Sequence, residues 1–85
     1  MSKTKIDIRD LIQEVLLSLR KQPGCAGVRN VVIDELDTDD EPYNWAVVAI
    51  DSGLSGEQES IAGLRAIEPE LQARYELLPI DRAKG

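Results

Sequence analysis

Residues 28–51 have the sequence VRNVVIDELDTDDEPYNWAVVAID, in which two apolar runs are separated by an acidic segment. Val, Ile, Trp and Tyr are enriched in β-strands, so we expect strands over about residues 28–36 and 43–51. The segment between them contains three aspartates, a glutamate and a proline, a composition typical of a turn. The two runs therefore predict an antiparallel hairpin.

Both predicted strands are apolar on both faces. Val31, Val32 and Ile33 are consecutive, and residues 46–50 are apolar throughout. Successive side chains of a strand point to opposite faces of the sheet. The hairpin therefore needs cover on both faces, or it exposes apolar atoms on the uncovered one.

A helix over about residues 7–21 is predicted before the hairpin. Asp7 suits the N-cap, and Pro23-Gly24 ends the helical pattern. Apolar residues recur at the spacing of one helical face, namely Ile8, Leu11, Ile12, Val15, Leu16 and Leu19.

A second helix is predicted over about residues 55–77. Ser55 to Gln58 match a capping box with Ser55 as N-cap. The apolar stripe keeps its phase through Pro69, which favours one kinked helix over two. Its members are Ile61, Leu64, Ile67, Leu71, Tyr75 and Leu78. We expect one α+β domain over residues 1–85, in the order α-β-β-α, with a loose tail at 81–85.

Charge is distributed unevenly along the chain. The net charge is −6, with +3 in residues 1–30 and −9 in residues 31–60. A negative chain argues against a nucleic-acid binder, because phosphate neutralisation dominates that affinity. The alternative, a nucleic-acid accessory factor, would use the basic start formed by Lys3, Lys5 and Arg9.

Residue usage also argues against catalysis. The chain has no His, which removes the commonest general base and metal ligand. We therefore expect that the protein is not an enzyme and binds no cofactor. Cys25 is the single cysteine, and a packing role is favoured over a reactive thiol. The longest apolar run, residues 46–50, is far shorter than the roughly 20 residues of a membrane span. Without a signal-peptide core, we expect a cytoplasmic protein of bacterial type.

The acidic turn carries the second functional alternative. Asp37, Asp39, Asp40 and Glu41 resemble a hard-cation site in composition. Calcium loops also need alternating ligands, a central Gly and a distal Glu, but no Gly follows Asp37-Thr38-Asp39 and Pro42 intervenes. A solvated turn is therefore favoured, and no metal ligand is assigned. An ion or small-ligand binder using residues 37–41 stays the alternative. A basic protein partner would also suit this surface.

Four apolar residues are candidate interface positions. Leu17 points about 180° from Ile8 on an ideal helix, away from the core stripe. Trp45 fits either an interface anchor or the largest core side chain. Val47 and Val48 occupy opposite faces of the predicted strand. We expect a non-enzymatic protein–protein interaction module that forms a homodimer, either by stacking hairpin faces or by pairing edges into a four-stranded sheet.

One resemblance involves the second half of the chain. The Asn44-Trp45 step in a strand, followed by a helix ending in the sequence LQARYEL at residues 71–77, resembles a group of short uncharacterised bacterial proteins. This resemblance implies an α-β-β-α domain. It implies no activity, cofactor or catalytic residue.

Overall fold

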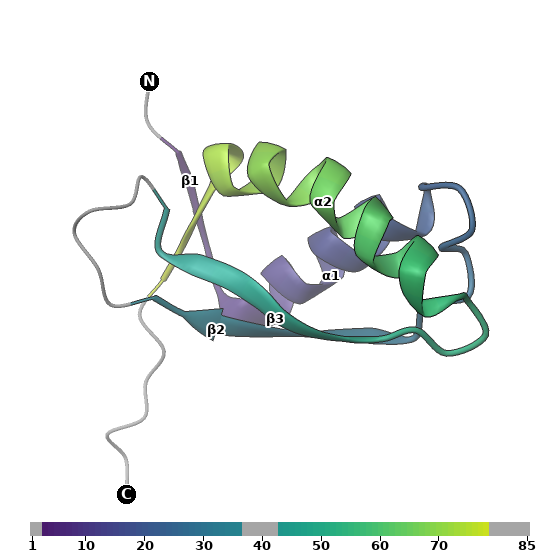
Figure 1. The fold of residues 1–85 in the computed structure, drawn as a ribbon. Helices are drawn as coiled ribbons and strands as arrows, with labels where there is room; N and C mark the ends of the chain where they lie inside the picture. The colour runs from purple at the N-terminus through teal and green to yellow at the C-terminus, as the bar shows by residue number, and fades with distance from the viewer. Residues whose placement is uncertain (1–2, 37–42, 79–85) are drawn as a thin grey trace, which may run out of the picture.

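The computed structural model describes residues 3–36 and 43–78. Its elements are β1 (Thr4–Ile6), α1 (Ile8–Arg20), β2 (Asn30–Glu35), β3 (Trp45–Asp51), α2 (Glu57–Arg74) and β4 (Tyr75–Leu77). Strands β2 and β3 pair antiparallel, whereas β1 and β4 form a separate parallel pair (Figure 1). The predicted α+β class and the antiparallel hairpin are confirmed.

Both helices lie on the same face of the β2–β3 hairpin (Figure 1), with α1 packed against β2 and α2 against β3. Along β2, Val31 and Ile33 are buried while Val32 between them is exposed. The core between helices and hairpin is formed by Leu11, Val15, Leu16, Leu19, Cys25, Val28, Val31, Ile33, Trp45, Ile67, Leu71 and Leu77.

Helix α1 agrees with its prediction to within one residue at each end. Asp7 is the N-cap, and its carboxylate accepts a hydrogen bond from the Asp10 N–H at 3.0 Å. At the other end, the Arg20 guanidinium donates to the carbonyl oxygens of Val28 and Arg29 at 2.9 and 3.3 Å. Arg20 thereby ties the end of α1 to the chain that enters β2.

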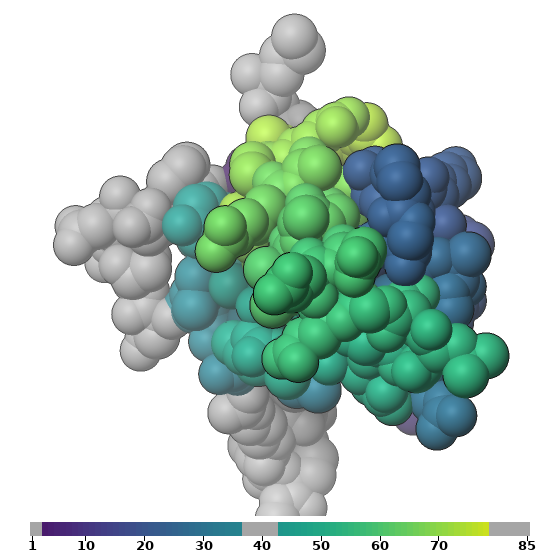
Figure 2. All heavy atoms as spheres, turned by 45° about the vertical axis from the view of Figure 1, so that its right-hand side comes forward, coloured from purple at the N-terminus to yellow at the C-terminus, as the bar shows by residue number. Residues whose placement is uncertain are grey.

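The predicted bounds of the second helix are wrong at both ends. It continues through Pro69 as one helix, as predicted, but its N-cap is Gly56 rather than Ser55. The Ser55 hydroxyl instead accepts a hydrogen bond from the Gly27 N–H at 2.8 Å. That contact joins the β3–α2 turn to the connection between α1 and β2, and the two segments lie side by side in Figure 2. Leu54 N–H donates to Gly27 O in the same region.

The buried face of α2 differs from the predicted stripe. Ser60 and Gly63 are buried in its first half, whereas Ile61 is 41% exposed. The reason is close packing, since a Cβ on Gly63 would lie 2.7 Å from the Cys25 sulfur. The small residues Ser60 and Gly63 allow α2 to approach this part of the core, and the larger Ile61 lies on the exposed side of the helix.

Strands β1 and β4 were not predicted. Residues 75–77 leave the helix and pair with β1 in the register Thr4↔Tyr75, Lys5↔Glu76, Ile6↔Leu77. In this extended conformation Leu77 is buried and Glu76 is exposed. The prediction of helix to residue 77 is therefore wrong, because main-chain partners in β1 compete with the last helical turn.

Candidate interaction surface

The structure places the predicted interface residues in different environments. Trp45 is completely buried, and its indole N–H donates to the Tyr75 carbonyl oxygen at 3.1 Å, so it is a core residue and offers no surface on the single chain. Val47 is half-buried and packs against the core, whereas Val48 is 58% exposed. Leu17 is 54% exposed on α1. The acidic candidates Asp37, Asp39, Asp40 and Glu41 lie outside the described residues.

The exposed face of the hairpin, opposite the helices, is apolar at its centre. We call it the outer face; its residues are Asn30, Val32, Asp34, Ala46, Val48, Ala49 and Asp51. Val32 is 54% exposed and lies directly across from Ala49. Among the described residues, no other element covers this face.

A register shift adds Val48 to the outer face. Val32 pairs with Ala49 and Ile33 pairs with Val47, so Val48 has no residue directly across from it. An extra residue of this kind bends a strand and re-aims its side chains. The sequence gives no signal for this shift, because all residues from 46 to 50 are apolar.

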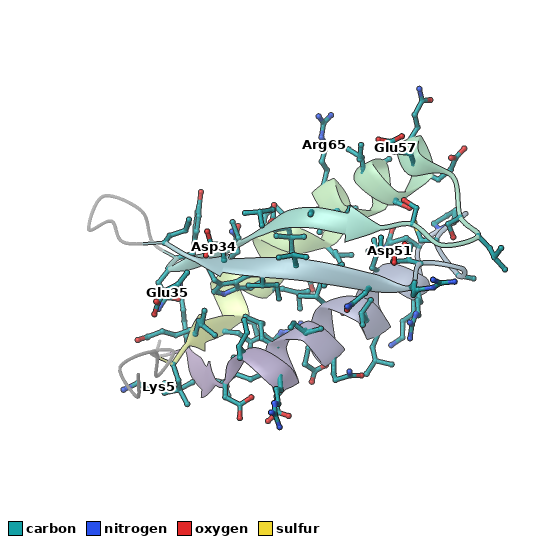
Figure 3. The ribbon with its side chains drawn as sticks, turned by 90° about the horizontal axis from the view of Figure 1, so that it is seen from below. Lys5, Asp34, Glu35, Asp51, Glu57 and Arg65 are labelled. Atoms are coloured by element: carbon teal, nitrogen blue, oxygen red, sulfur yellow. The ribbon has the colours of Figure 1, made fainter. Side chains whose placement is uncertain are left out.

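Charged residues lie at the two ends of the outer face. Figure 3 shows Asp34 and Glu35 near one end of the hairpin and Asp51 near the other. Arg29 is exposed at the Asp51 end, where its N–H donates to the Asp51 carbonyl oxygen at 2.9 Å. The Arg20 guanidinium also lies at that end. One end of the hairpin is therefore acidic, and the other carries two arginines beside one aspartate.

A groove with a volume of about 250 Å³ lies between β3 and the first half of α2. We call it the β3–α2 groove; its lining residues are Val47, Val48, Ala49, Ile50, Ser52, Glu57, Ile61 and Leu64. Beside it, α2 bonds to the main chain of β3. Glu68 accepts from the Val47 N–H, and the Gln72 amide donates to the Trp45 carbonyl oxygen, each at 2.8 Å.

Cys25 has the properties of a packing residue. Its thiol is buried and donates to the Glu59 carbonyl oxygen at 3.1 Å. Burial raises the pKa of the Cys25 thiol, and the nearby Glu59 carboxylate raises it further. Nucleophilic cysteines need the opposite shift. The thiol is thus protonated at neutral pH, and it is enclosed by the core.

The described residues offer no metal-binding cluster and no membrane-spanning helix. Within residues 3–36 and 43–78, no group of three His, Cys, Asp or Glu side chains is arranged to hold a metal ion. Neither described helix has the length and apolar character needed to cross a membrane.

Comparison with known proteins adds no functional information. No protein-family model, no curated protein and no solved structure matches the chain.

Proposed function

We propose that this protein is a non-enzymatic protein–protein interaction module that acts as a homodimer through the outer face of its hairpin. The observation that supports this most strongly is the pair of valines, Val32 and Val48, each more than half exposed on a sheet face that no other described element covers. A two-stranded ribbon with one apolar face open to water is marginal, and burying that face is favourable at roughly 25 cal/mol per Å².

The size of the face sets the expected affinity. Strands of six and seven residues are about 20 Å long at 3.3 Å per residue. Two such strands offer less than the roughly 800 Å² per partner of a standard interface. We therefore expect a weak dimer that dissociates in the micromolar range.

The charges favour a dimer in which the two hairpins run in opposite directions. A two-fold axis that lies between the stacked faces and runs across the strands places the Asp34 and Glu35 end of one copy against the Arg29 end of the other. The parallel arrangement would place acidic end against acidic end. Exposed ion pairs contribute little affinity, so the charges select the orientation while the valines supply the binding energy.

Light scattering across micromolar concentrations tests the proposal. Wild-type protein should approach twice the chain mass of 9.4 kDa as concentration rises, and Val32→Asp should stay monomeric while keeping its melting temperature. Leu17→Asp makes the same chemical change on α1 and should leave the dimer intact. A wild-type monomer at all concentrations would refute the homodimer. A dimer lost in Leu17→Asp but kept in Val32→Asp would move the contact to α1.

The other functions remain predictions. An ion or small-ligand binder would use residues 37–41, and calcium titration of the melting temperature tests it; we expect no saturable rise. A nucleic-acid accessory factor would use Lys3, Lys5 and Arg9, and salt-dependent retention of DNA or RNA tests that. The expected cytoplasmic location and a basic protein partner likewise remain to be tested.

A further inference from the structure

The first half of α2 presents two large apolar side chains that the core leaves partly uncovered. Ile61 is 41% exposed and Leu64 is half-buried, and both line the β3–α2 groove. The buried positions of this half are taken by Ser60 and Gly63 instead. Helix α2 therefore lines the groove beside β3 with apolar side chains.

The edge of β3 that faces this groove is divided into two parts. In the first part, Trp45 and Val47 bond to the side chains of Gln72 and Glu68, so that stretch is already occupied. In the second part, residues 48–51, no side chain of α2 bonds to the main chain among the described residues. A strand paired on one side only presents N–H and C=O groups that can accept another strand.

We propose that the β3–α2 groove binds an extended peptide segment of a partner protein, which adds as a third strand beside residues 48–51. Its main chain would pair with the free part of the β3 edge, and alternate apolar side chains would contact Ile61 and Leu64 beneath α2. This site shares Val48 and Ala49 with the outer face, but Val32 does not line it, so a change at Val32 affects the proposed dimer face alone.

Size and charge specify the peptide further. The groove volume, about 250 Å³, is below the roughly 300–1,000 Å³ of small-molecule pockets, so it suits one or two side chains of a longer segment. Glu57 is the charged residue of the lining, and Figure 3 shows Arg65 extending from α2 away from the hairpin. The Glu68 carboxylate lies near the other end of the groove, where it accepts a hydrogen bond from the Val47 N–H. A peptide with Lys or Arg beside its apolar residues matches these carboxylates.

A displayed library of random twelve-residue peptides, selected on the intact protein, provides the probe. We expect enriched sequences with apolar residues two apart and a neighbouring Lys or Arg. Synthetic copies should lose about tenfold or more in affinity for Ile61→Lys, since the change removes the apolar contact and opposes the basic residue. Affinity for the volume-conserving Ile61→Met should be kept. Methylating alternate backbone nitrogens of the peptide should abolish binding, because strand addition needs those donors.

Two control variants make the outcome decisive. Leu17→Lys introduces the same charge at an exposed leucine away from the groove and should bind the peptide normally, as should Val32→Asp. Failure to enrich any sequence above selection on Ile61→Lys would overturn the proposal, and so would peptides that bind both proteins equally. A dimer lost in Ile61→Lys but kept in Val32→Asp would show that a second copy occupies the groove. A Val32→Asp variant that is monomeric should still bind the peptide with unchanged affinity.

Discussion

The side chain of Asn44 forms two hydrogen bonds with the main chain of Leu77. Its amide nitrogen donates to the Leu77 carbonyl oxygen at 2.8 Å, and its amide oxygen accepts from the Leu77 N–H at 3.0 Å. The neighbouring Trp45 donates to the carbonyl oxygen of Tyr75. The Asn44-Trp45 step thus holds β4 against the start of β3, although no strand pairing joins the two sheets.

Replacing Asn44 should therefore destabilise the fold. Asn44→Ala removes the hydrogen-bond partners of the Leu77 N–H and C=O groups. Because Leu77 is only 1% exposed, these groups would be left buried and unsatisfied, at a cost of about 1–3 kcal/mol. Asn44→Asp keeps only the acceptor and should also lose stability. Urea denaturation at fixed chain concentration measures the change. Asn30→Ala, at the exposed start of β2, is the matched control and should be close to neutral. Equal stability of Asn44→Ala and wild type would contradict a tethering role.

Gly63→Ala should destabilise the protein, although Ala is favoured over Gly in a helix by about 1 kcal/mol. The new Cβ would lie 2.7 Å from the Cys25 sulfur and 3.1 Å from Leu19 Cδ1, and overpacking costs about 1–3 kcal/mol.

A double-mutant cycle identifies the cause of that loss. In a Cys25→Ala background the sulfur is absent, so Gly63→Ala should cost less than in wild type, by about 0.5 kcal/mol or more. Additive effects would show that the contact with Cys25 does not set the cost.

The buried thiol predicts a loss of stability at alkaline pH. Burial raises the pKa of Cys25 above its ordinary value, with a further contribution from Glu59. The unfolded chain therefore releases this proton at a lower pH than the folded chain does. The thiol's contribution to the free energy of unfolding is constant below the ordinary cysteine pKa, about 8.5, and falls as pH rises above it.

Chemical denaturation from pH 7 to pH 10 tests this sign. Wild type should lose more free energy of unfolding than Cys25→Ala over the alkaline part of that range, so that the gap between the two changes only there. Parallel curves would show that the thiol titrates alike in both states.

The parts of the fold predicted from sequence are those with local signals. Helix α1 has a capping aspartate and six apolar residues on one face, all of which lie in or against the core. The hairpin follows from its β-branched runs. By contrast, β1 and β4 are three residues long and join segments about 70 residues apart. Strands this short show no periodicity, and Tyr75 continues a helical stripe as well as it begins a strand.

The sequence predicts only part of the candidate interaction surface. An uncovered apolar face follows from consecutive apolar residues in both strands, and the exposure of Leu17 follows from helix geometry. The β3–α2 groove does not follow, because Ile61 and Leu64 fit a core stripe by spacing. Only the tertiary contact of Gly63 with Cys25 shows which side of α2 is buried.

Val47 and Val48 provide the sharpest test of the two sides of the hairpin. Val47 lies across from the buried Ile33, packs against the core, and bonds through its N–H to Glu68. A charge there has no partner inside the core, so Val47→Asp should unfold the domain or lower its free energy of unfolding by about 3 kcal/mol or more. Val48 is 58% exposed, so Val48→Asp should keep the folded state.

The oligomeric state then separates the adjacent valines. Val48→Asp should be a folded monomer in light scattering, with an unchanged circular dichroism spectrum, because its charge would be buried without a partner in the stacked faces. Val48→Thr keeps the shape and adds only a hydroxyl, so it should retain part of the dimer. A folded Val48→Asp dimer would exclude the outer face as the contact. A Val47→Asp variant as stable as wild type would instead show that the core does not extend to that side of β3.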